Sequence, residues 1–92
     1  MKIAGRHYRT IWLADDGWRV TVIDQTKLPF RLETVTLSTA ERAAEAIRTM
    51  VVRGAPLIGA TAAYGVALAM RAAPSDAALS EALALLGATR PT

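Results

Sequence analysis

The chain has 92 residues and a mass of 9.8 kDa, which is the size of one small domain and excludes two. Hydrophobic residues make up 52% and charged residues 21%, so the chain can form a core and does not have the composition of a disordered protein. The absence of cysteine excludes disulfides and thiolate zinc sites, and the net charge of +3 comes from scattered basic residues, which argues against a nucleic-acid partner. Because the first five residues lack the apolar stretch of a signal peptide, we expect a cytoplasmic protein.

The front part of the chain predicts strands, because β-branched and aromatic residues alternate there with turn formers. The dipeptide Asp16-Gly17 favours a tight reversal with Gly17 at positive φ, and therefore a β-hairpin. A further antiparallel strand follows the hairpin. The three predicted strands cover residues 8–13, 18–23 and 31–37.

The back part of the chain predicts about three helices. Ser38 and Glu41 have the spacing of a capping box, so a first helix begins there, and its apolar periodicity stops near Arg53. Ser75 can cap a third helix that runs through Leu86. We therefore predict a single α+β domain over 1–92, with a strand-rich part over 1–37 and a helical part over 38–92.

A second helix is predicted from Pro56 to Arg71, because proline suits the first turn of a helix. It overlaps an uncharged run over 54–70 that is at the short end for a membrane span and is diluted by proline, glycine and polar residues. We expect a buried soluble helix that neighbours cover on several sides, and no membrane partner.

The junction before this second helix has the features of a phosphate site. A helix start presents free amides and a positive dipole end, Gly54 lets the backbone approach a ligand, and Arg53 adds a cation with forked donors. Neither a Walker loop nor a dinucleotide-binding turn is present. Spacing alone favours an ordinary interhelical turn over a phosphate site, but the residue pattern is compatible with both.

Two separated motifs carry a family resemblance. The first is Arg53-Gly54-Ala55-Pro56-Leu57-Ile58-Gly59, and the second is Ile23-Asp24-Gln25-Thr26-Lys27-Leu28-Pro29. Both resemble motifs of the 5-methylthioribose-1-phosphate isomerases. The stretches 8–12 and 89–92 are also similar to that family, so the resemblance covers nearly the whole chain.

The resemblance implies a two-domain architecture. Family members have a small N-terminal domain of this length, followed by a larger Rossmann-like domain that holds the catalytic cysteine and aspartate, and they usually form homodimers. This chain resembles the first domain only. We therefore expect a piece of a longer protein, with no catalytic residue of its own and no activity when it is isolated.

The resemblance also implies a reaction and a set of binding residues. The family converts the aldose 5-methylthioribose 1-phosphate into the ketose 5-methylthioribulose 1-phosphate in methionine salvage, without a metal or organic cofactor. A proton or a hydride could move between C1 and C2, and this chain leaves both routes open. Carried over by motif, the residues that bind the sugar phosphate are Arg53, Gly54, Ala55 and Arg90.

Two other functions share the first motif in looser form. One is a non-catalytic interaction or sugar-phosphate-sensing module like the regulatory subunits of translation initiation factor 2B. The other is a ribose-1,5-bisphosphate isomerase, whose substrate carries a second phosphate where methylthioribose carries an apolar tail. The Asp-Gln motif and the Trp-containing hairpin favour the methylthioribose enzyme.

The remaining polar and aromatic candidates have structural interpretations. Asp24 and Gln25 are expected to organise a turn through bonds to backbone amides. The single histidine, His7, has no partner for a metal pair and is expected at the surface. The two tryptophans that flank the hairpin turn, Trp12 and Trp18, could form a cross-strand pair or cover the pocket, and we expect the cross-strand pair.

Overall fold

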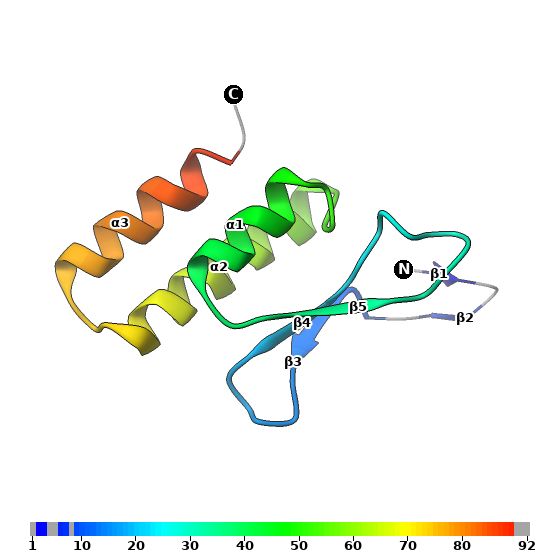
Figure 1. Ribbon diagram of the computed structural model, residues 1–92, viewed down its shortest axis with the longest axis horizontal. Coiled ribbons are helices and arrows are strands. Elements are labelled where there is room, and N and C mark those ends of the chain that lie inside the picture. Colours follow the sequence, from blue (N-terminus) through cyan, green and yellow to red (C-terminus); the bar gives the residue numbers. More distant parts are fainter. Residues whose placement is uncertain (1, 4–5, 8, 90–92) are drawn as a thin grey trace.

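A computed structural model describes residues 2–3, 6–7 and 9–89 (Figure 1). Three antiparallel strands form the main sheet, and a separate pair of two-residue strands precedes it. The order in the main sheet is β3-β4-β5, with Leu13 opposite Val20 and Val20 opposite Leu37. The strands are β1 (Lys2–Ile3), β2 (Arg6–His7), β3 (Ile11–Leu13), β4 (Val20–Ile23) and β5 (Thr34–Leu37).

The predicted hairpin is confirmed, with Gly17 at φ 79°, but its strands are shorter than the sequence suggests. The Asp16 carboxylate accepts hydrogen bonds from the amides of Trp18 and Arg19, both at 3.0 Å, and holds these residues in the loop. The third strand begins at Thr34 instead of residue 31, because the amide of Arg31 donates to the carbonyl of Lys27 in a turn.

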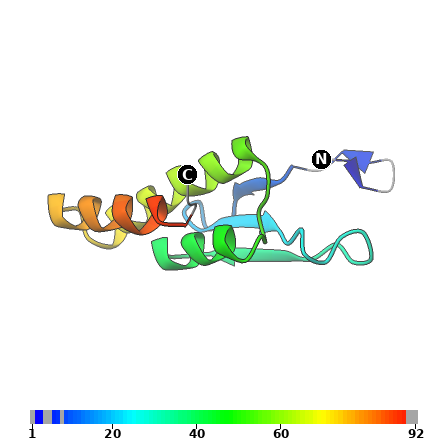
Figure 2. The same cartoon turned by 90° about the horizontal axis from the view of Figure 1, so that it is seen from above.

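Three helices follow the sheet, as predicted, and they lie together at one end of the molecule (Figure 1). Seen from above, α2 lies on the β3 side of the sheet and α1 on the β5 side, which agrees with the contacts between these elements (Figure 2). α3 packs on both of the other helices. The helices are α1 (Ala40–Arg48), α2 (Ala55–Ala72) and α3 (Asp76–Gly87).

The capping residue of α1 is Thr39, so the prediction of Ser38 was wrong by one position. The Thr39 hydroxyl accepts from the amide of Arg42 at 3.1 Å. The predicted end of this helix near Arg53 was also wrong. α1 stops at Arg48, because the chain turns back to place Val52 in the core, where its amide donates to the carbonyl of Ala46.

The start of α2 and the cap of α3 match the sequence. Gly54 is the N-cap of α2 and Pro56 lies in its first turn, while the Ser75 hydroxyl accepts from the amide of Ala78 at 3.1 Å. Gly87 ends α3 as its last residue.

The covering of α2 differs from the prediction that neighbours surround it. Of its 18 residues, one stripe is buried against the rest of the described chain, and the opposite side is partly or fully open. α2 is long and apolar enough to cross a membrane by length and composition, a test that core helices of soluble proteins also pass. The buried stripe consists of Leu57, Thr61, Gly65 and Leu68.

The core joins buried residues of β4 and β5 to buried residues of all three helices. All four residues of β4 are buried, so both faces of this central strand are covered. Gly65 of α2 marks the closest approach of the helices, because a Cβ placed there would lie 3.0 Å from a methyl of Leu86 and 3.1 Å from Cβ of Ala43. The largest fully buried side chains are Ile23, Leu37, Val20, Val22, Val52 and Thr61.

Candidate functional site

The corner between α1 and α2 brings together three of the four predicted binding residues. Arg53, Gly54 and Ala55 are contiguous there and all three are exposed. Gly54 has φ 91° and ψ 133°, a conformation that is essentially restricted to glycine, although a Cβ would meet nothing within 4 Å. Glycine is therefore required for the path of the backbone, not for space.

The start of α2 differs from those of the other two helices in charge. α1 has a Thr39 cap and Glu41 in its first turn, and α3 has a Ser75 cap and Asp76 in its first turn. α2 has no side-chain cap and no acidic residue in its first turn. The positive end of its dipole is therefore left uncompensated by the described side chains, which suits an anion brought by a ligand.

Two hollows of about 400 Å³ each border this corner, and Arg53 and Gly54 line both of them. The corner is thus accessible to a ligand from two sides. The first hollow is lined in addition by Thr10, Ile11, Gln25, Pro56, Leu57 and Ala60. The second is lined in addition by Ile47, Arg48, Met50, Val52, Ile58 and Thr89.

Gln25 joins the second sequence motif to the site, a role that sequence reasoning missed. Its amide donates to the carbonyl of Val51 at 2.9 Å, and the residue lines the first hollow beside Arg53. The turn-forming role predicted for Asp24 is confirmed, because its carboxylate accepts from the amide of Thr26 at 2.9 Å and from the Thr26 hydroxyl at 2.5 Å. The signal that the sequence offered was that the same family resemblance covers both motifs.

The whole chain matches curated proteins named methylthioribose-1-phosphate isomerase. The protein from Methylobacterium nodulans is 66% identical over 92 residues, and that from Acidiphilium cryptum is 63% identical over 93 residues. Each match covers 100% of this chain and 25% of the relative. The chain is a homologue of the methylthioribose-1-phosphate isomerases. It spans about a quarter of the length of the curated relatives that it matches.

Solved structures confirm the α+β fold of this isomerase homologue. The 5-methylthioribose 1-phosphate isomerase from Pyrococcus horikoshii OT3 superposes with a TM-score of 0.81 at 36% identity, covering 91% of this chain and 25% of that one. Translation initiation factor eIF-2B, subunit delta, from A. fulgidus gives 0.80 at 39% identity, covering 94% and 26%. No protein-family model matches the chain.

The fourth predicted binding residue of the isomerase homologue, Arg90, lies outside the described residues. Its neighbour Thr89 is buried, and the Thr89 hydroxyl donates to the carbonyl of Leu86 at 2.6 Å. Thr89 also lines the second hollow together with Arg53 and Gly54. The described chain therefore ends beside the corner that holds the other three residues.

The expected tryptophan pair does not form, because the sheet register places Thr21 opposite Trp12. Trp18 instead packs under Arg71 of α2, whose guanidinium carbon lies 4.1 Å from the centre of the indole ring. This cation–π contact ties the hairpin loop to α2. The side chain of His7 lies outside the described part, and no group of three possible metal ligands occurs within that part.

Asp16 is a structural residue of the hairpin. Hydrogen bonds from the amide of Trp18 and from the Arg19 side chain, which favour the carboxylate, lower the pKa of Asp16 from 3.8 to about 2. The carboxylate is engaged with its own loop and lines none of the hollows at the corner.

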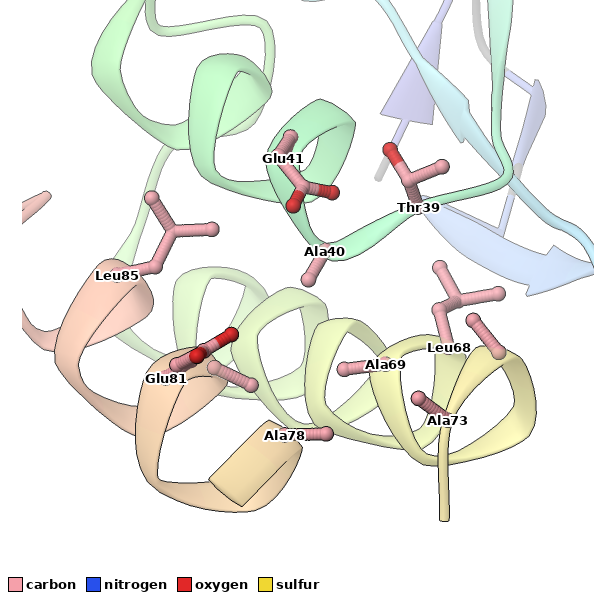
Figure 3. A pocket seen from close by; sticks show the side chains of 11 residues that line it. Thr39, Ala40, Glu41, Leu68, Ala69, Ala73, Ala78, Glu81 and Leu85 are labelled. Atoms are coloured by element: carbon pink, nitrogen blue, oxygen red, sulfur yellow. The ribbon is translucent and has the colours of Figure 1, made fainter. Parts of the chain in front are cut away.

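A third hollow, of about 390 Å³, lies between the start of α1, the end of α2 and α3 (Figure 3). Glu41 and Glu81 bring carboxylates to it, and the other lining side chains are mostly alanine and leucine. A surface with two carboxylates repels a phosphate dianion. This hollow is therefore unsuited to a sugar phosphate, despite a volume similar to those at the corner.

Proposed function

We propose that this chain is the N-terminal substrate-binding part of a sugar-phosphate isomerase that converts 5-methylthioribose 1-phosphate into 5-methylthioribulose 1-phosphate. The observation that carries the proposal is the exposed corner at Arg53 and Gly54, where a cation and an uncapped helix start lie together on two hollows. The identity of 60–66% to several isomerases over the whole chain supports the same reaction.

The corner offers the phosphate contacts that this reaction requires. A phosphate on the anomeric carbon blocks ordinary ring opening, so the enzyme must hold a dianion firmly while hydrogen moves between C1 and C2. The Arg53 guanidinium offers paired donors, and the amide of Ala55 at the start of α2 has no predecessor carbonyl within the helix to bond. Arg90 is proposed to add a second guanidinium to this phosphate.

The chemistry itself is proposed to reside in the remainder of a longer protein. The chain has no cysteine, and among the described residues no aspartate or glutamate lines either hollow at the corner. The open side of α2, which includes Gly59 and Ala63, is proposed to pack against that remainder. We also propose that the full-length protein forms a homodimer in the cytoplasm and acts in methionine salvage.

A non-catalytic module is the second candidate, because the initiation factor subunit from A. fulgidus superposes about as well as the isomerase from P. horikoshii. The fold is therefore compatible with both functions. The higher identity to curated isomerases favours catalysis.

The direct test is an assay of the full-length protein with two sugar phosphates. We expect conversion of 5-methylthioribose 1-phosphate to the ketose and little turnover of ribose 1,5-bisphosphate. Preferred turnover of the bisphosphate would assign the sibling isomerase. Binding of either sugar phosphate without turnover would assign the non-catalytic module.

A further inference from the structure

Met50 has a backbone conformation that is unusual for its side chain. Among the described residues it is the one non-glycine residue at positive φ, with φ 64°. It follows the end of α1, where Thr49 is the C-cap, and glycine is the residue that most often takes this left-handed position because it has no Cβ. A methionine here costs stability relative to glycine.

Burial in the core does not offset this cost. The Met50 side chain is 54% exposed, whereas Val52, two residues later, is 1% exposed and belongs to the core. A strained residue that contributes little packing and lies at a ligand-sized hollow is a candidate for a functional contact. Met50 lines the second hollow, beside Arg53 and Gly54.

The lining of the second hollow suits a small ligand that has one apolar end and one charged end. Ile47, Met50, Val52 and Ile58 give it an apolar wall, and its remaining lining is polar or charged except for Gly54, from Arg48, Arg53 and Thr89. Its volume of about 400 Å³ is in the range of small-molecule sites. The first hollow also has apolar lining, from Ile11, Pro56, Leu57 and Ala60, but it has Thr10 and Gln25 next to the same corner and lacks Met50.

We propose that Met50, together with Ile47 and Ile58, forms the subsite for the apolar methylthio tail of the sugar phosphate, while the corner at Arg53 and Gly54 holds the phosphate. This inference rests on the proposed function and adds a specificity-determining residue to it. A methionine thioether is polarisable and adaptable, which suits contact with another thioether.

The test compares two substrates in the full-length protein. One is 5-methylthioribose 1-phosphate, and the other is 5-deoxyribose 1-phosphate, which has hydrogen in place of the methylthio group. For Met50→Gly we expect the ratio of kcat/KM between the two substrates to fall about tenfold, since pocket contacts with one small apolar group contribute discrimination of this order. The thermal midpoint is expected to stay the same or rise, because glycine relieves the strained φ.

Two further variants sharpen the test. Met50→Leu keeps an apolar side chain of similar volume and is expected to retain most of the discrimination. Leu83→Ala removes an exposed apolar side chain of α3 and is expected to leave the ratio unchanged.

The outcomes separate the subsite from the proposed function. An unaltered ratio in Met50→Gly, or an equal loss in Met50→Leu, would overturn the subsite while leaving the isomerase assignment intact. Absence of turnover of 5-methylthioribose 1-phosphate by the wild-type protein would overturn the proposed function, and the subsite with it.

Discussion

The amide of Gln25 donates a hydrogen bond of 2.9 Å to the carbonyl oxygen of Val51. This bond joins the turn that follows β4 to the connection that precedes Arg53. The turn is held in place by the carboxylate of Asp24, which is 8% exposed and accepts from the amide of Thr26. Two motifs that are distant in sequence thus form one structural unit at the corner.

Replacement of Asp24 by alanine is therefore expected to lower the stability of the protein and to weaken substrate binding at the corner. Loss of the carboxylate leaves the Thr26 amide without its acceptor, at a cost of about 1–3 kcal/mol. Urea denaturation measures the free energy of unfolding, and KM for the sugar phosphate should rise severalfold in the full-length protein. Asp24→Asn keeps an acceptor oxygen and should lose less, while the exposed Asp15→Ala should change stability by less than about 0.5 kcal/mol. Equal effects of Asp24→Ala and Asp15→Ala would contradict this role.

Two glycines of α2 allow the same substitution to be compared in different surroundings. In the 92-residue chain by itself, Gly59→Ala should increase stability by about 1 kcal/mol, because alanine has the higher helix propensity and a Cβ at this position meets nothing within 4 Å. At Gly65 a Cβ would lie 3.0 Å from Leu86 and 3.1 Å from Ala43, so Gly65→Ala should destabilise by about 1 kcal/mol or more. Thermal unfolding of both variants measures the difference, and a stabilising Gly65→Ala would show that the helices are less tightly packed than described.

Elements with strong local signals could be predicted from the sequence. Gly17 at positive φ, Pro56 in the first turn of α2 and the Ser75 cap each depend on the chemistry of one or two neighbouring residues. For the corner at Arg53 and Gly54, local spacing alone favoured an ordinary turn, and the family resemblance was needed to predict a binding site; the structure keeps these residues exposed.

Features that depend on tertiary contacts could not be predicted. α1 ends early because Val52 must reach the core. The residues around Met50 give no local signal for its left-handed backbone conformation. Ser38 and Thr39 are both good capping residues, and strand β5 ends just before them, so the choice between them depends on where the buried Leu37 is fixed. The place of Gln25 beside Arg53 depends on pairing between segments far apart in the chain.

The pH dependence of stability should report on Asp16. Its pKa in the folded chain is about 2 and its ordinary value is 3.8, so the folded state favours the carboxylate. The resulting stabilisation is fully present above about pH 4 and is lost as the pH falls from 4 towards 2. Asp16→Asn should therefore lower the thermal midpoint at pH 6 and flatten its decline between pH 4 and 2. An NMR titration that gave Asp16 an ordinary midpoint would contradict the hydrogen-bonded loop.

Affinity of the full-length protein for 5-methylthioribose 1-phosphate tests most directly whether the phosphate is held at the corner. Calorimetric titration would compare Arg53→Ala with Arg42→Ala, which removes the same charge from an exposed position of α1. Charge-assisted hydrogen bonds contribute about 1.5–3 kcal/mol, so Arg53→Ala should weaken binding about tenfold or more. Arg42→Ala should remain within about twofold of wild type, because an exposed charge away from the ligand is screened by solvent. Equal affinities for the Arg53→Ala variant and the wild-type protein would contradict the assignment of this corner.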